Sequence, residues 1–185
     1  VHEGKQSIKF TAGAYTGELP KADIQRYSLI FKKGEDVWFS GWYYLVGGNT
    51  KEHYIFFWDL EATKTGTGSP GRRLYLSGAD WIASDLGKFY RIPILNWFGA
   101  PTFRQDPKTA IPFPKDSWVH IKVHLYLSDS SDGKMEVWQN DVKVIDGDGQ
   151  TLPTADSVYD RLQVGITSNG DTKNAQTLYV DDIKI

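Results

Sequence analysis

The sequence lacks several features that would assign it to a class at once. It contains no cysteine, which excludes disulfides, thiolate metal sites and cysteine nucleophiles. No apolar run approaches the roughly 20 residues that span a bilayer, and no block of like charge indicates a membrane surface or a disordered tail. The net charge of -2 leaves no basic footprint for nucleic acid. We therefore expect neither a nucleic-acid partner nor a membrane partner.

Leucine-rich helical periodicity and internal repeats are also missing. The chain has instead 14% aromatic residues, with 7 Trp and 10 Tyr, together with 18 Gly and 8 Pro. These residue types favour strands joined by tight turns. A length of 185 residues suits one domain with its own core, so we expect a single all-β domain over residues 1–185. The opening Val1-His2-Glu3-Gly4 does not resemble a signal peptide, so we expect a mature or trimmed chain.

The clearest strand pattern is Trp118 to Leu127, where apolar and polar residues alternate with a period of two. Successive side chains on a strand point to opposite faces. One face is therefore core, formed by Val119, Ile121, Val123, Leu125 and Leu127. The other face mixes rings with titratable groups, which suits flat polar ligands with apolar faces; its residues are Trp118, His120, Lys122, His124 and Tyr126. The alternative is that a neighbouring loop covers these outer residues.

Similar patterns predict further short strands, separated by turn residues. They are Gln6 to Thr11, Arg26 to Phe31, Val37 to Val46, His53 to Ala62, Arg72 to Ser77, Lys134 to Gln139, Val142 to Asp146, Arg161 to Asn169 and Thr177 to Ile185. Val37 to Val46 is aromatic on both faces, which places it in the middle of a sandwich. Asp23 could cap a single turn before Arg26. About ten to twelve strands with turns near every ten residues predict a two-sheet antiparallel sandwich.

Two carboxylates stand out in the predicted strand His53 to Ala62. Strict alternation puts one set of residues on one face, namely Tyr54, Phe56, Trp58 and Leu60, and a second set on the other, namely His53, Ile55, Phe57, Asp59 and Glu61. Asp59 and Glu61 would lie about 7 Å apart, near the separations that glycoside hydrolases use. The alternative is that both end the strand as solvated ion pairs with the basic region of Lys64, Arg72 and Arg73.

The least regular part of the chain is Trp81 to Pro114, which holds five prolines among several aromatic residues. It cannot be one long helix. Long segments of this kind inside a compact domain are commonly functional loops, so it could form a wall or lid over the face with His120 and His124. Equally, it could be a hydrophobic plug at one end of the sandwich.

Several stretches together resemble a known family. They are the Trp-x-His alternation at Trp118, the Asp-Gly turn, Met135-Glu136-Val137-Trp138-Gln139-Asn140, Thr151-Leu152-Pro153, Leu162-Gln163-Val164-Gly165-Ile166 and Leu178-Tyr179-Val180-Asp181-Asp182-Ile183. They resemble the concanavalin A-like lectin/glucanase sandwich, and within it the jelly rolls of the heparin, alginate and glucuronan lyases. The resemblance covers mainly Trp118 to Ile185. It implies two stacked antiparallel sheets, of which the concave one carries a polysaccharide groove.

Lyases of this group use a Gln-x-His strand and a Tyr-x-Lys-x-Gly-x-Tyr strand, often with an Arg or Asn that neutralises the uronate carboxylate. Here His53 to Glu61 lacks Gln-x-His, and Thr167 stands where the second tyrosine would be. β-Elimination still needs only a base near neutral pKa, a proton donor and a carboxylate neutraliser. Arg161 supplies the last of these, and the candidate catalytic residues are His53, His120, His124 and Tyr126.

Metal binding is a separate possibility. His120 and His124 would lie about 13 Å apart on one strand, too far to share a zinc ion without other ligands. The resemblance implies a structural calcium held by an acidic residue of the last strand, and Asp181 or Asp182 with a backbone carbonyl would serve. Alternatively, one of these faces solvent and the other caps the sheet edge. We expect no organic cofactor.

The first functional hypothesis is a carbohydrate-binding domain or lectin with an aromatic and polar concave sheet face. Its stacking platforms would be Trp118, Tyr126 and Trp138, and its polar contacts Lys122, Glu136, Arg161 and Gln163. The alternatives are a polysaccharide lyase that cleaves an acidic glycan by β-elimination, a glycoside hydrolase, or a structural domain. An acidic glycan fits Lys122, Arg161 and Arg72 better than a neutral one. We expect a monomer with a polysaccharide partner, in a secreted, extracellular or periplasmic location.

Overall fold

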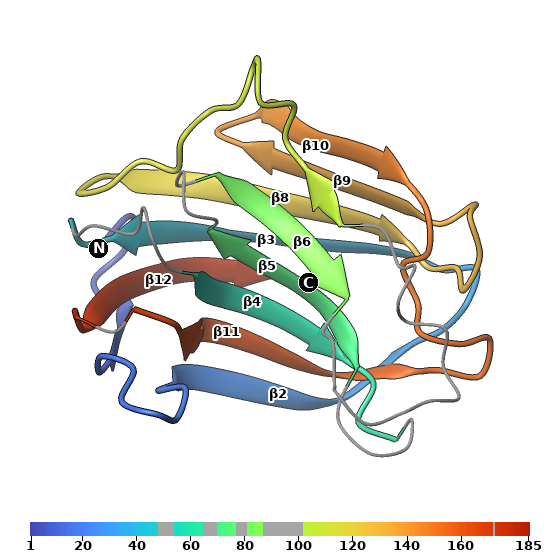
Figure 1. Cartoon of the computed structure of the whole chain (residues 1–185), viewed down its shortest axis with the longest axis horizontal. Coiled ribbons are helices and arrows are strands. Elements are labelled where there is room, and N and C mark those ends of the chain that lie inside the picture. Colours follow the sequence, from blue (N-terminus) through green and yellow to red (C-terminus); the bar gives the residue numbers. More distant parts are fainter. Residues whose placement is uncertain (48–53, 65–69, 77–80, 87–101, 172) are drawn as a thin grey trace.

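The protein is an antiparallel sandwich of two six-stranded sheets (Figure 1). The computed structural model describes residues 1–47, 54–64, 70–76, 81–86, 102–171 and 173–185. Sheet A has the strand order β1 (Ile8–Ala12), β12 (Gln176–Lys184), β3 (Asp36–Leu45), β8 (Trp118–Tyr126), β9 (Lys134–Gln139) and β10 (Val142–Asp148). Sheet B has the order β2 (Ala22–Phe31), β11 (Tyr159–Asn169), β4 (Ile55–Glu61), β5 (Gly71–Leu76), β6 (Ile82–Leu86) and β7 (Phe103–Arg104). The predicted all-β sandwich is confirmed.

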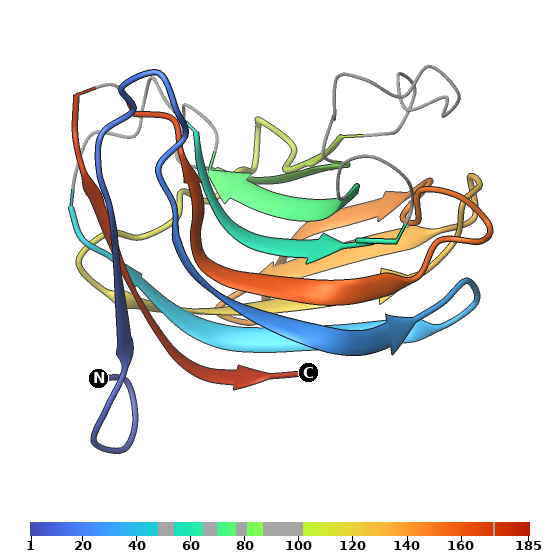
Figure 2. The ribbon, with the colours of Figure 1, turned by 90° about the horizontal axis from the view of Figure 1, so that it is seen from below.

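Both sheets bend in the same direction, which gives the sandwich a convex and a concave side (Figure 2). Sheet A lies on the outer, convex side of the bend, and sheet B lies on the inner, concave side. β3 is a central strand of sheet A, as its two aromatic faces predicted. The outward faces of the two sheets are therefore on opposite sides of the molecule, with the hydrophobic core between them. No described segment is a helix long and apolar enough to cross a membrane.

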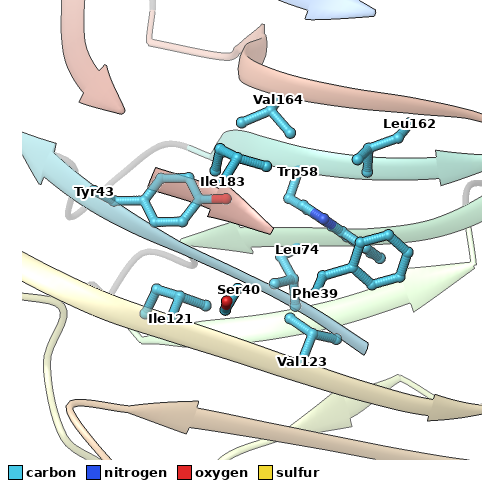
Figure 3. A pocket seen from close by; sticks show the side chains of 10 residues that line it. All are labelled: Phe39, Ser40, Tyr43, Trp58, Leu74, Ile121, Val123, Leu162, Val164 and Ile183. Carbon is cyan, nitrogen blue, oxygen red and sulfur yellow. The ribbon is translucent and has the colours of Figure 1, made fainter. Parts of the chain in front are cut away.

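The core is built from the apolar halves of the alternating strands. Val119, Ile121 and Val123 of β8 are at most 2% exposed, as the period of two predicted. Aromatic pairs join the sheets, with Phe39 of sheet A at 5.1 Å from Trp58 of sheet B between ring centroids. Figure 3 shows Phe39, Trp58, Ile121 and Val123 among the side chains around a cavity of about 10 Å³, room for at most one water molecule. The two inner faces therefore leave little free space between them at this point.

Strict alternation is wrong for the first half of β4. The register of its pairing with β5 shifts between Phe56 and Trp58, as it does at a β-bulge. The successive residues Phe57 and Trp58 therefore both lie in the core, where each is only 2% exposed. Phe56 is left on the outward face. After the irregularity the period of two resumes, so Asp59 and Glu61 face outward as predicted while Trp58 faces the core. A strand irregularity of this kind changes which residues share a face.

Two local predictions also need correction. Asp23 lies within β2 and caps no turn, because β2 begins at Ala22. The irregular segment Trp81 to Pro114 contributes the short strands β6 and β7 to sheet B. In its described part, Phe103 and Phe113 are 5% and 3% exposed and belong to the hydrophobic core. Residues 87–101 lie outside the described residues, so the lid interpretation stays a prediction.

Candidate functional site

A row of polar side chains crosses the outward face of sheet B, on the inside of the bend. Gln163 of β11 is directly opposite Gln25 of β2 on one side and Asp59 of β4 on the other. Asp59 is in turn directly opposite Arg73 of β5. Directly opposed residues of antiparallel strands share a face and have neighbouring side chains. The row therefore brings together residues from four strands that are far apart in the sequence.

A second row beside the first contains an ion pair. Arg161 of β11 is directly opposite Tyr27 of β2 and Glu61 of β4. Arg161 Nε donates a hydrogen bond to Glu61 Oε2 at 2.7 Å, and Nη2 donates to the same oxygen. Arg161 Nη1 also donates to the Tyr27 hydroxyl at 3.5 Å, and that hydroxyl donates to Gln25 Oε1 at 2.5 Å. The two rows form one polar cluster, which consists of Gln25, Tyr27, Asp59, Glu61, Arg73, Arg161 and Gln163.

The two carboxylates of the polar cluster have different surroundings. Glu61 is held by Arg161, whose hydrogen bonds oppose the burial that raises the pKa of Glu61. Asp59 is 5% exposed, and its Oδ1 atom is buried without a hydrogen-bond partner among the described residues. Burial raises the pKa of Asp59 to about 7, while the charge of Arg73 acts against the increase and that of Glu61 adds to it. A buried carboxyl group that titrates near neutral pH is a signal of a functional site.

The interpretation of Asp59 and Glu61 as solvated ion pairs is wrong, because their exposed fractions are only 5% and 6%. Arg72, one of the expected partners, lies on the core side of β5 and is 0% exposed. Its guanidinium carbon is 4.5 Å from the ring centroid of Phe103, and it donates a hydrogen bond to the carbonyl oxygen of Gln150. Arg72 therefore stabilises the core and cannot serve as a glycan contact on this face.

Aromatic rings border the polar cluster along β4 and β5. The guanidinium carbon of Arg73 lies 4.4 Å from the ring centroid of Phe56. Phe56 contacts Tyr75 with ring centroids 5.0 Å apart, and Tyr75 contacts Tyr54 at 5.7 Å. Tyr54 is 55% exposed at the edge of this group. Rings next to charged groups offer apolar surface beside polar contacts, the combination that binds sugars.

The predicted histidine face lies on the convex side of sheet A, opposite to the polar cluster (Figure 2). His124 Nδ1 is 2.8 Å from Glu136 Oε2, and its Nε2 is 2.7 Å from Asp36 Oδ1. The indole ring of Trp38 stacks on the imidazole at 4.2 Å. Both ring nitrogens and one ring face of His124 are thus occupied by side chains of β3 and β9. These contacts hold three strands together.

Two of the predicted stacking platforms on this face, Trp118 and Trp138, contact neighbouring side chains of sheet A. Trp138 stacks against Trp38 at 5.7 Å between centroids, and Lys122 Nζ lies 4.4 Å from the centroid of the Trp138 ring. Trp118 lies 5.5 Å from Tyr44, edge to face. Rings that pack across strands stabilise the sheet, so these contacts explain the aromatic residues of this face without a ligand.

The remaining predicted residues of sheet A are also part of this surface. The ring of His120 lies 5.0 Å from that of Trp42, and burial lowers the pKa of His120. Tyr126 ends β8, directly opposite Asp36 and Lys134. Of the predicted site residues in the described part of the chain, Arg161, Gln163 and the carboxylate pair Asp59 and Glu61 belong to the polar cluster.

The acidic pair of the last strand has local partners. Asp181 Oδ2 accepts hydrogen bonds from the backbone nitrogens of His2 and Glu3, at 3.0 and 3.3 Å. Asp182 accepts one from Lys184 Nζ at 2.8 Å. No group of three or more His, Cys, Asp or Glu residues that could hold a metal occurs among the described residues. Calcium at Asp181 or Asp182 stays a prediction, and His53 lies outside the described residues.

Comparison with known proteins gives the family. A family model described as polysaccharide lyase matches residues 1–184. The chain belongs to this polysaccharide lyase family. No curated protein matches the chain. The resemblance that the motifs indicated is thereby confirmed, and a lyase is better supported than a domain that only binds carbohydrate.

Solved structures of lyases share the fold of this family member. An endo-β-1,4-glucuronan lyase from the fungus Trichoderma reesei has a TM-score of 0.78 at 15% identity, covering 99% of this chain and 82% of that one. An alginate lyase from Chlorella virus has a TM-score of 0.59 at 12% identity, with coverage of 99% and 85%. An alginate lyase mutant in complex with an alginate trisaccharide has a TM-score of 0.52 at 10% identity, with coverage of 94% and 86%.

Sequence reasoning missed part of the polar cluster. Gln25, Tyr27 and Arg73 were not proposed as site residues, although Arg73 was recognised as basic. The alternation of Arg73 with Tyr75 around the core residue Leu74 was an available signal for an outward polar face on β5. Which strands lie beside β5 could not be seen in the sequence, because β4, β11 and β2 come from three separate parts of the chain.

Proposed function

We propose that the protein is a polysaccharide lyase that cleaves an acidic, uronate-containing glycan by β-elimination at the polar cluster. The observation that carries the proposal is the position of two guanidinium groups, those of Arg73 and Arg161, on the concave face of a polysaccharide lyase family member. Cationic groups on a concave surface attract polyanions and form strong hydrogen bonds with carboxylates. The named substrates of the solved neighbours, glucuronan and alginate, are both polymers of uronic acids.

The elimination has two chemical requirements that these residues can meet. A base removes the proton from C5 of the uronate, the electron pair forms the C4–C5 double bond, and the C4–O bond to the leaving sugar breaks. The leaving oxygen then takes up a proton. Arg161 and Arg73 offset the negative charge that the carboxylate gains as the C5 proton leaves. Removal of that proton becomes easier as a result.

Tyr27 is the described residue best placed to move the proton. Its hydroxyl lies 3.5 Å from Arg161 Nη1, and the residue is 54% exposed on the rim of the polar cluster. In the proposed step Tyr27 acts as the phenolate: its oxygen accepts the C5 proton, and the phenol so formed can donate that proton to the leaving oxygen. One residue would thus serve both proton transfers.

The test is to incubate the protein with glucuronan, alginate, heparin and pectin and to follow the ultraviolet absorbance of the conjugated, unsaturated uronate product. We expect absorbance to rise with at least one polymer. Tyr27→Phe should lower kcat by about 100-fold or more, the usual size of general acid–base catalysis, and it should fold because Tyr27 is exposed. Arg161→Gln should also lose activity, whereas Arg26→Gln, on the opposite face of β2, is the matched control.

Three results would each contradict a part of the proposal. Constant absorbance with every polymer would remove the lyase activity. Full activity of a folded Tyr27→Phe variant would keep the activity but move the proton transfer to another residue. Comparable losses in Arg161→Gln and Arg26→Gln would indicate a general effect of removing positive charge, and would not locate the site at the polar cluster.

A further inference from the structure

The polar cluster contains two neighbouring carboxylates, Asp59 and Glu61, which would repel the acidic substrate expected there if both were ionised and unpaired. Glu61 is neutralised by its ion pair with Arg161. The Oδ1 atom of Asp59 is buried, and no described residue donates a hydrogen bond to it. An ionised oxygen in that position would lose its hydration, and the charge of Arg73 and the hydroxyl of Thr167 offset only part of that loss. The geometry therefore favours the protonated, neutral form of Asp59.

The charged groups that face Asp59 come from every neighbouring strand. Glu61 follows it on β4, Arg73 is opposite on β5, and Arg161 lies on β11. Lys21, just before β2, acts on Asp59 from farther away. Asp23 of β2 adds a carboxylate at the edge of the same face, where it accepts a hydrogen bond from Gln25 Nε2 at 3.3 Å. Asp85 of β6 is opposite Arg73 along the backbone, and its side chain lies outside the described residues.

We propose that Asp59 is a positioning residue that sets the charge of the polar cluster, and that it is neutral when the acidic glycan binds. Counted with Lys21 and Asp23, the described cations then exceed the anions by one charge, and the two are equal in number when Asp59 is ionised. The uncharged carboxyl leaves Arg73 and Arg161 a net attraction for the uronate. An ionised Asp59 would compete with the uronate carboxylate for Arg73 and would repel it. This inference rests on the proposed function of the same face.

A direct consequence is an affinity that depends on pH. Burial raises the pKa of Asp59 to about 7, so the residue is neutral below that value and ionised above it. The bound uronate is anionic throughout this range and would raise the pKa of Asp59 further. Binding should therefore take up a proton near neutral pH and weaken as pH rises, by about tenfold over the range in which Asp59 ionises.

The experiment measures Kd for oligosaccharides of glucuronan and alginate by calorimetry at several pH values on both sides of neutrality, with kcat/KM wherever the wild type eliminates. Asp59→Asn mimics the neutral carboxyl in size and shape. Its Kd should stay at the low-pH value of the wild type over the whole range. Asp148→Asn, an exposed aspartate of β10 on sheet A, is the control and should keep the wild-type pH dependence. A purely structural role of Asp59 would not make the pH profile flat.

The outcomes separate this inference from the proposed function. Binding that weakens with pH in the wild type but not in Asp59→Asn supports the role of Asp59, even if no polymer is cleaved and the lyase activity is lost. A wild-type Kd that does not change with pH, or an Asp59→Asn variant with the wild-type profile, overturns it. Loss of turnover at all pH values in folded Asp59→Asn, with intact binding, would make Asp59 a catalytic base and also overturn it. Absence of both binding and elimination would overturn both proposals.

Discussion

Replacing Asp59 by Asn should stabilise the folded protein at alkaline pH and leave its stability unchanged at acid pH. Burial raises the pKa of Asp59 from 3.8 to about 7, so the folded state keeps a proton that the unfolded state releases. Between these values the unfolded chain binds fewer protons than the folded chain, and the free energy of unfolding falls as pH rises. Above about pH 7 the full cost of burying the carboxylate is present. Asn cannot ionise, so the variant avoids this cost.

The magnitude follows from the difference between the two pKa values. A difference of about 3 corresponds to about 4 kcal/mol above neutral pH, and the effect disappears below about pH 4. A domain of this size changes its Tm by about 2–4 °C per kcal/mol. The Asn variant should therefore melt roughly 8–16 °C above the wild type at about pH 8. Glu61 is retained in both proteins, so its own pH dependence cancels in the comparison.

The assay is thermal unfolding followed by tryptophan fluorescence at about pH 4, 6 and 8. Trp58 is a suitable reporter because it is buried between the sheets. Asp148→Asn is again the control, since its side chain is 75% exposed and its effect should stay below about 1 kcal/mol. A difference in Tm between Asp59→Asn and the wild type that does not change with pH would refute the reasoning. It would show that the folded protein does not hold a proton on Asp59 up to neutral pH.

Two further predictions concern the ion pair and the histidine face. Glu61→Gln should lower the free energy of unfolding by about 3 kcal/mol in urea denaturation, because it leaves the largely buried Arg161 without its charged partner; a loss below about 0.5 kcal/mol would mean that the pair contributes little. His124→Ala should cost about 1–2 kcal/mol, since it removes two hydrogen bonds and the stacking on Trp38. The His124→Ala variant should keep the wild-type rate of uronate elimination, because His124 lies on the convex side of the sandwich, away from the polar cluster. A folded His124→Ala variant without turnover would return the chemistry to sheet A.

Local patterns were sufficient where a strand has one face in the core. The alternation at Trp118 to Leu127 predicted the core-facing and outward-facing sets of β8 correctly, and the bounds of β9, Lys134–Gln139, were predicted without error. A buried face forces a strict period of two, because any slip would place polar side chains in the core. At β4 the irregularity after Phe56 breaks this rule. The short strands β6 and β7 were missed because each is short and both lie in the proline-interrupted segment, where a periodic signal is absent.

The composition and motifs by themselves determined an all-β sandwich of the lyase type, since aromatic and β-branched alternation, frequent turns and the stretches after Trp118 are all local features. Only the tertiary structure decided which face carries the candidate site. The mixture of His and Trp on β8 suggested a ligand surface, yet those side chains bind one another across β3, β8 and β9. The polar cluster is assembled from β2, β4, β5 and β11 by strand order and register. Both the bend of the sheets and the burial that makes Asp59 unusual arise from packing between distant segments, which no local pattern encodes.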